Sequence, residues 1–127
     1  GEKFWDGDIR EFPKLNCFLS LANDGSLALK NGTPKNTKGS IWAYNGKGNR
    51  PKWKIKPEPT IYRFYTFVEN GQMKILREKD GRPTVLIYKT PPVKGSGQYK
   101  LGITASKSLV VFLENSENTE IVWRSHG

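Results

Sequence analysis

Cysteine and histidine are almost missing from this 127-residue chain, which contains one of each. The single cysteine, Cys17, excludes an internal disulfide, and its place in an alternating apolar stretch predicts a buried structural thiol. One cysteine and one histidine are too few for a zinc site, which needs clustered ligands. His126 is next to last in the chain, so no Ser–His–Asp triad can be assembled convincingly. A surface turn explains the carboxylate pair Asp6 and Asp8, and we therefore expect neither an enzyme nor a bound cofactor.

Long apolar runs and helical periodicity are also missing. No run approaches the roughly 18–20 apolar residues that a membrane-spanning helix needs, and the opening residues show no signal-peptide pattern. Apolar residues instead recur with a period of two, as at Leu27 and Leu29 and at Leu109 and Val111. The 13 glycines and 8 prolines are dispersed and divide the chain into short segments. This pattern predicts an all-β protein.

One motif occurs three times: an alternating strand, a polar turn, a second strand and then an aromatic residue. The turn centres are Gly25, Gly71 and Lys107, and the aromatics Trp42, Tyr88 and Trp123 follow them by 17, 17 and 16 residues. Such even spacing predicts one small β unit used three times, with the recurring aromatics in the core. The expected repeats cover about residues 15–45, 61–90 and 97–125 of a single domain that spans residues 1–127.

Each repeat is predicted to contain a polar loop before its third strand. The loops are expected at residues 30–40, 77–82 and 114–120, and the strands after them at 41–44, 84–88 and 121–124. Asp24-Gly25 and Asn70-Gly71 indicate hairpin turns, because both residue types tolerate positive φ. Residues 4–12 are expected to add one edge strand that closes the sheet system.

Positive charge is in excess, with 21 Lys and Arg against 12 Asp and Glu and a formal net charge of +9. Such an excess favours anionic partners, although it also serves solubility alone. Five of these charges form a candidate anion patch without an acidic residue: Lys47, Arg50, Lys52, Lys54 and Lys56. The same segment also fits an amphipathic edge strand that places Trp53 in the core and lysines at the edge.

A family resemblance rests on CFLSLANDGSLAL at residues 17–29 followed by IWAYNGKG at residues 41–48. These stretches, with SLVVFLENSENTEIVWRS near the C-terminus, resemble the bulb-type mannose-binding lectins of monocots. The resemblance covers nearly the whole chain. It implies a β-prism II, in which three four-stranded antiparallel sheets surround a pseudo-threefold axis. A β-trefoil is the alternative, because it also has three repeats of about this length.

The resemblance also implies where a sugar would bind. The family uses the strand pattern QxDxNxVxY, whose alternate side chains face one side of a sheet. No repeat of this chain keeps the full set, so we expect a ligand other than simple mannose, possibly an acidic or sulfated glycan. The residues at or beside the pattern positions are Asp24, Ser26 and Lys30 in the first repeat, Asn70 and Gln72 in the second, and Thr104, Ser106, Ser108, Val110 and Phe112 in the third.

The sequence therefore leaves two hypotheses of function open. The first is a secreted or extracellular, non-catalytic lectin-like domain that binds glycans or glycoproteins and dimerises by exchanging C-terminal strands. The second is a lectin scaffold whose sugar sites no longer bind sugar and which instead contacts a protein, a membrane surface or a nucleic acid. Four less regular aromatics could stack on a sugar or a base: Trp5, Tyr44, Tyr62 and Tyr65.

Overall fold

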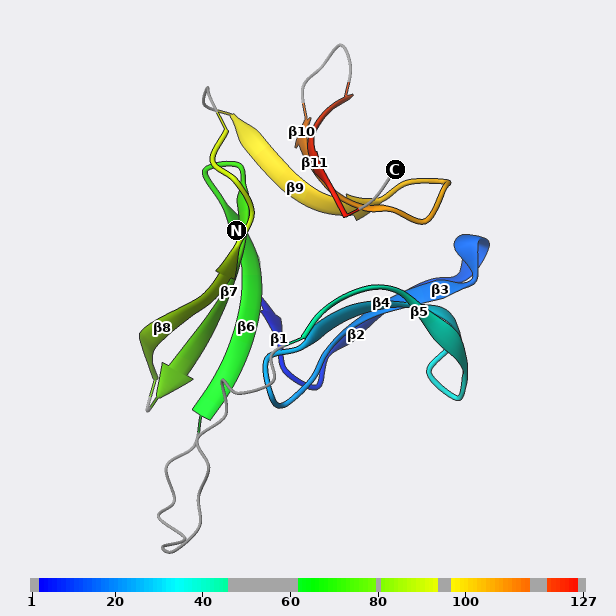
Figure 1. The fold of residues 1–127 in the computed structure, drawn as a ribbon. Helices are drawn as coiled ribbons and strands as arrows, with labels where there is room; N and C mark the ends of the chain where they lie inside the picture. Colours follow the sequence, from blue (N-terminus) through cyan, green and yellow to red (C-terminus); the bar gives the residue numbers. More distant parts are fainter. Residues whose placement is uncertain (1–2, 46–61, 80, 94–96, 115–118, 126–127) are drawn as a thin grey trace, which may run out of the picture.

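The computed structural model describes residues 3–45, 62–79, 81–93, 97–114 and 119–125, without the side chains of residues 84 and 119. The described chain is all-β, apart from a short 3₁₀ turn at Pro13–Leu15, and its strands form three antiparallel sheets around a common centre (Figure 1). The prediction of an all-β fold is confirmed. Among the described residues, no helix is long and apolar enough to cross a membrane.

Each repeat supplies the hairpins of one sheet. Sheet A has the order β1 (Phe4–Trp5), β6 (Tyr62–Glu69), β7 (Gln72–Lys79) and β8 (Arg82–Lys89). Sheet B has the order β2 (Ile9–Phe12), β3 (Cys17–Leu21), β4 (Leu27–Thr33) and β5 (Asn36–Tyr44). Sheet C contains β9 (Gln98–Ile103), β10 (Leu109–Glu114) and β11 (Thr119–Arg124), with β10 in the middle.

The N-terminal segment forms two strands rather than the one that was expected. β1 pairs with β6 in sheet A, and β2 pairs with β3 in sheet B. A tight turn separates the two strands, in which Gly7 has a φ of +86° and the Trp5 amide donates to Asp8 Oδ2 at 2.9 Å. One short segment therefore flanks two sheets, because the turn redirects the chain within three residues.

Two of the predicted polar loops are instead strands joined by tight turns. β4 continues to Thr33 and β5 begins at Asn36, where the Asn36 amide donates to Thr33 Oγ1 at 3.2 Å. Similarly, β7 continues to Lys79 and β8 begins at Arg82. The prediction was wrong here because polar residues in long hairpins face solvent and look like loops. In the third repeat, residues 115–118 lie outside the described residues, and the strand after them begins at Thr119.

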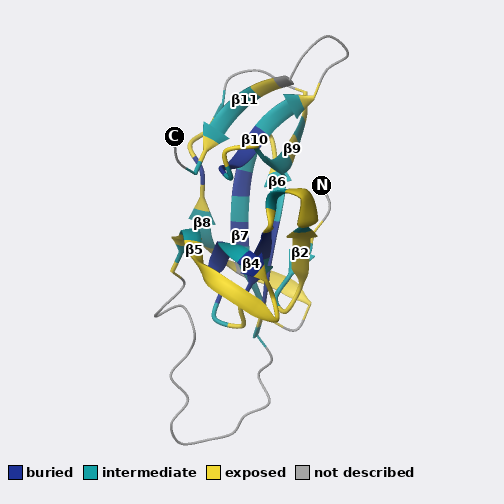
Figure 2. Ribbon diagram, turned by 90° about the vertical axis from the view of Figure 1, so that its right-hand side faces the viewer, coloured by how far each residue is buried: buried dark blue, intermediate teal, exposed yellow. Residues whose placement is uncertain are grey.

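The core lies where the inner faces of the three sheets meet (Figure 2). Its fully buried members are Cys17, Leu19, Leu21, Leu27 and Leu29 of sheet B, Phe64, Met73 and Ile75 of sheet A, and Leu109 and Val111 of sheet C. The recurring aromatics are half-buried and pack against this cluster, and the Trp42 and Trp123 rings meet edge to face at 5.8 Å. The prediction that they belong to the core is confirmed.

Two hairpin turns pack closely against residues from other parts of the fold. At Gly25 a Cβ atom would lie 2.9 Å from the Phe64 ring, and at Gly71 it would overlap Val93. Both glycines have positive φ, +87° and +78°, which L-residues rarely adopt. Glycine is therefore needed at these turns both for the backbone and for the packing.

Cys17 is a buried thiol, as predicted, and is 2% exposed. Burial raises its pKa above 9.0, and the nearby charge of Lys107 opposes that effect only in part. The thiol therefore stays protonated at neutral pH and behaves as a small apolar side chain.

β11 pairs with β10 of the same chain along five residue pairs. An exchange of C-terminal strands would make this same pairing between two copies. The homodimer stays a prediction.

Candidate functional site

In the first repeat, Asp24 and Ser26 close the β3–β4 turn, and Lys30 lies farther along the second strand. Asp24 Oδ1 accepts a hydrogen bond from the Ser26 amide at 2.9 Å, which is a turn contact between residues two apart. Lys30 lies on β4, is half-buried and pairs with Phe18 across the strands. Asp24 therefore stabilises the hairpin turn that the sequence predicts here, and its Oδ1 atom is already engaged by that turn.

In the second repeat, one predicted residue shapes the turn and the other joins two strands. Asn70 has a φ of +52° and precedes Gly71 in the tight β6–β7 turn. Gln72 Nε2 donates to the Thr90 carbonyl at 2.7 Å, and the Thr90 hydroxyl accepts from the Met73 amide at 3.0 Å. The Gln72 amide group thus holds the end of β8 against β7.

In the third repeat, the hydroxyl groups bond to the turn itself. Thr104 Oγ1 accepts from the Ser108 amide at 3.1 Å and lies 2.9 Å from Ser106 Oγ. Ser108 and Val110 are 1% and 4% exposed, so neither presents its side chain to a dissolved ligand. Phe112 is half-buried and lies across Gly102, where a Cβ atom would be 2.9 Å from the ring.

The three sets of predicted residues lie at three separate turns and do not converge on one pocket. The five residues of the predicted anion patch, Lys47, Arg50, Lys52, Lys54 and Lys56, lie outside the described residues. Among the described residues, no three His, Cys, Asp or Glu side chains form a group that could hold a metal ion.

An aromatic ladder crosses the outer face of sheet A. The rings of Trp5 and Tyr65 are 5.0 Å apart, and those of Tyr65 and Phe67 are 5.7 Å apart. Trp5 pairs with Tyr65 in the β1–β6 register, while Tyr65 and Phe67 are two residues apart on β6 and share a face. Phe64 and Thr66, which alternate with them, are buried on the inner face.

Positive side chains cover this ladder at one end. The Arg63 guanidinium lies 4.5 Å from the centre of the Trp5 ring, and Lys3 Nζ lies 4.7 Å from that of Tyr65. These distances are typical of cation–π contacts. Arg63 also bonds to Asp6 Oδ1 at 3.0 Å, which holds the guanidinium over the ring.

Two further lysines extend the positive charge across the sheet. Lys74 of β7 pairs with Phe67 on one side and with Lys89 of β8 on the other, so all three share the outer face. Glu69 pairs with Lys74 at 2.9 Å, but Lys3 and Lys89 have no carboxylate partner in the part of the chain that the structure describes. We call Trp5, Tyr65 and Phe67 with Lys3, Arg63, Lys74 and Lys89 the cation–aromatic face.

The Tyr65 phenol is neutral over an unusually wide pH range. Burial raises its pKa above 10.0, and the negative charges of Glu78 and Glu69 raise it further. Burial also raises the pKa of Tyr88, with a smaller contribution from Tyr44, whose ring is 4.6 Å away. Both phenols are therefore uncharged at physiological pH. Tyr65 is only 3% exposed, so Trp5 and Phe67 provide the accessible ring surface of the ladder.

These shifts predict a loss of stability in alkaline solution. Tyr65 and Tyr88 ionise near pH 10 in the unfolded chain but hold their protons more tightly when folded. Their contribution is therefore complete below about pH 10 and is lost as the pH rises through the folded pKa values. Urea unfolding at increasing pH should show this decline, and Tyr65→Phe should make it shallower. An unchanged slope in the variant would contradict the assignment to Tyr65.

Comparison of this chain with protein-family models, with curated proteins and with solved structures found no match. The candidate site is thus defined by the geometry of this chain alone.

Lys3, Phe67 and Lys89 were missed by the sequence analysis. Phe67 could have been found, because it lies two residues after Tyr65 in an alternating strand. Lys3 could not, because its place over Tyr65 depends on the pairing of β1 with β6, about 60 residues away in the chain.

Proposed function

We propose that this protein is a non-enzymatic, lectin-like domain of β-prism II type that binds an acidic or sulfated glycan outside the cell. The observation that carries the proposal is the cation–aromatic face of sheet A. The sequence resemblance to bulb-type lectins supports the class, and three antiparallel sheets, one from each repeat, are compatible with the prism.

The face offers the two kinds of contact that an acidic sugar needs. The apolar C–H side of a sugar ring packs on exposed aromatic surface, which the half-buried rings of Trp5 and Phe67 provide. Lysine and arginine nitrogens donate charge-assisted hydrogen bonds to sulfate or carboxylate oxygens, each worth about 1.5–3 kcal/mol. Lys3 and Lys89 are exposed at opposite sides of the ladder and are the first candidates for these contacts.

The second repeat also connects this face to the lectin pattern. Gln72 and Lys74 occupy pattern positions of that repeat, and the β6–β7 register places them opposite Glu69 and Phe67. The pattern positions of the second repeat therefore share the face with the aromatic ladder. In the first and third repeats, Ala28 and Val110 hold corresponding strand positions and are buried.

A titration with a sulfated oligosaccharide tests this proposal. We expect a heparin fragment to bind at low salt and more weakly at about 0.15 M salt, where exposed charges are screened beyond about 8 Å. Removing both lysines of one side, Lys74→Gln with Lys89→Gln, should weaken binding about tenfold, because 1.4 kcal/mol corresponds to that factor.

The matched control is Lys14→Gln with Lys38→Gln, which removes the same charge from exposed positions outside sheet A. Equal losses in the two double variants would mean that net charge, and not this face, binds the glycan. Tighter binding of a neutral mannose oligosaccharide would contradict the proposed ligand class.

A further inference from the structure

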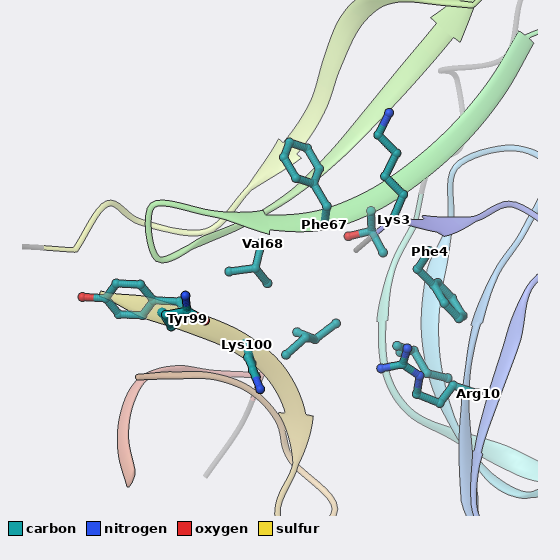
Figure 3. Close-up of a pocket in the computed structure, with 11 residues that line it drawn as sticks. Lys3, Phe4, Arg10, Phe67, Val68, Tyr99 and Lys100 are labelled. Atoms are coloured by element: carbon teal, nitrogen blue, oxygen red, sulfur yellow. The ribbon is translucent and has the colours of Figure 1, made fainter. Parts of the chain in front are cut away.

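A hollow of about 330 Å³ adjoins the cation–aromatic face. Lys3 and Phe67 of that face belong to its lining, together with Val68 of β6. Figure 3 shows Val68 projecting from β6 toward β9, while Phe67 and Lys3 project from the opposite side of β6. The hollow and the face therefore lie on the two sides of one strand and share residues at its edge.

The edge of β6 is the place where one ligand can reach both sides. The pairing of β1 with β6 ends at Phe4 and Thr66, so the next two residues of β6 lie beyond the last β1 pair. These are Phe67, which faces outward, and Val68, which faces the hollow. A sugar chain that packs on the Phe67 ring therefore has only this edge to cross before it enters the hollow.

The far wall of the hollow carries main-chain donors and acceptors of β9. The Thr104 amide donates to the Ser108 carbonyl at 3.0 Å, and hydrogen-bonded pairs alternate along an antiparallel ladder. In the continuous β9–β10 register, the N–H and C=O groups of Tyr99 and Leu101 therefore point away from β10. Both residues line the hollow, and no other described strand pairs with this side of β9.

The size and the remaining lining fit one sugar unit with a small apolar group. Ligand pockets usually measure about 300–1,000 Å³, and this hollow lies at the lower end of that range. Its apolar wall includes the side chains of Leu19, Val68 and Leu101. Such a wall suits a methyl group, because burial of apolar surface is favourable.

The cations around the hollow are already engaged. Lys100 Nζ pairs with Glu114 at 3.1 Å, and Lys3 Nζ lies 4.7 Å from the centre of the Tyr65 ring. Arg10 also takes part in an interaction within the chain. A neutral group enters the hollow without breaking any of these contacts, so the hollow favours an uncharged part of the ligand.

We propose that the hollow is a second subsite of the glycan site and holds the acetamido group of an N-acetylated amino sugar. This group has the N–H and C=O of a peptide unit, so it pairs with the free groups of Tyr99 and Leu101 as a strand would, and its methyl group contacts Val68. The neighbouring acidic sugar then lies by Phe67 and Lys74, which face each other in the β6–β7 register. The inference rests on the proposed function and narrows its ligand to glycans that alternate a uronic acid with an N-acetylated amino sugar.

Two oligosaccharides of equal charge test the proposal. A hyaluronan fragment alternates glucuronic acid with N-acetylglucosamine, and an oligogalacturonate with the same number of carboxylates has no acetamido group. We expect the hyaluronan fragment to bind about tenfold more tightly, because two further hydrogen bonds form in the hollow. We expect it alone to slow hydrogen exchange at the Tyr99 and Leu101 amides.

A variant that fills the hollow makes the test specific. Val68→Phe should lower the affinity for the hyaluronan fragment to that for the oligogalacturonate, and should leave the latter unchanged. The matched control is Val85→Phe on β8, at an exposed position outside the lining of the hollow, which should change neither affinity. Free N-acetylglucosamine tests the hollow in the unmodified chain, where it should shift the methyl NMR signals of Val68 and Leu101, whereas glucose should not.

The outcomes separate this subsite from the glycan proposal. Equal affinities of the unmodified chain for the two oligosaccharides, or an N-acetylglucosamine that leaves the Val68 and Leu101 signals unchanged, would overturn the subsite even if acidic glycans bind the outer face of sheet A. If N-acetylglucosamine shifts these signals but neither oligosaccharide binds, the N-acetyl site stands and the acidic-glycan proposal fails.

Discussion

Replacing Trp5 with alanine is expected to weaken binding of a sulfated oligosaccharide by about 5- to 150-fold. Stacking of a nucleic-acid base on one aromatic side chain contributes about 1–3 kcal/mol, and we take the same range for a sugar ring packed on Trp5. Trp5 is also the end of the ladder that carries the Arg63 guanidinium, 4.5 Å from its ring. Its loss removes the stacking surface and leaves Arg63 less firmly positioned. Isothermal titration with a heparin fragment measures the change.

Two variants make the Trp5 result specific. Trp5→Phe keeps an aromatic ring and should retain most of the affinity. Phe112→Ala removes an outer-face aromatic from sheet C, where the sequence pattern also predicts a sugar contact, and should leave the affinity unchanged. A larger loss for Phe112→Ala than for Trp5→Ala would move the site from sheet A to sheet C.

Replacing Ile75 with alanine is expected to lower the free energy of unfolding by about 2–5 kcal/mol, the range for deleting a buried aliphatic side chain. Ile75 lies on β7, is 0% exposed and belongs to the cluster in which the three sheets meet. The cavity left behind would lie in this common cluster. Urea unfolding followed by tryptophan fluorescence measures the change.

Ile9 provides the matched control, because it is the same residue type on β2 but is 50% exposed. Ile9→Ala should change the free energy of unfolding by no more than about 0.5 kcal/mol. Similar values for the two variants would contradict a single core common to the three sheets.

The regular part of the fold could be predicted from the sequence because its determinants are local. Short apolar stretches such as residues 17–21 and 109–111 mark buried strands, and Asp24-Gly25 and Asn70-Gly71 mark the turns between strands. The burial of Cys17 followed from the same alternation. A period of two read over a few residues is therefore enough to find the strands and their inner faces.

The pairing of the N-terminal segment could not be predicted in the same way. Nothing local to Phe4 or Ile9 indicates that one belongs to sheet A and the other to sheet B, because each choice depends on partners far along the chain. Among the described strands, β9 has a partner only on the side of β10, since the segment that flanks the other two sheets is not available to a third. The cation–aromatic face depends on the pairing of β1 with β6, which brings Trp5 beside Tyr65.

The candidate site could be predicted only in part, and the reason is chemical. Short polar side chains at hairpin turns serve both ligand binding and turn formation, and the sequence does not distinguish these uses. In the structure, Asp24 and Thr104 accept hydrogen bonds from backbone amides of their own turns. Tyr65 and Trp5 were recognised as possible stacking residues, but their contact with each other depends on the β1–β6 pairing.

The central claim is that an acidic glycan binds the outer face of sheet A, and chemical-shift mapping with a sulfated oligosaccharide tests it most directly. We expect saturable shifts of the backbone amides and side chains of Trp5, Phe67, Lys74 and Lys89, with smaller effects elsewhere in the chain. Shifts confined to the turns around Asp24 and Ser106, or no shifts at an excess of the oligosaccharide, would contradict it.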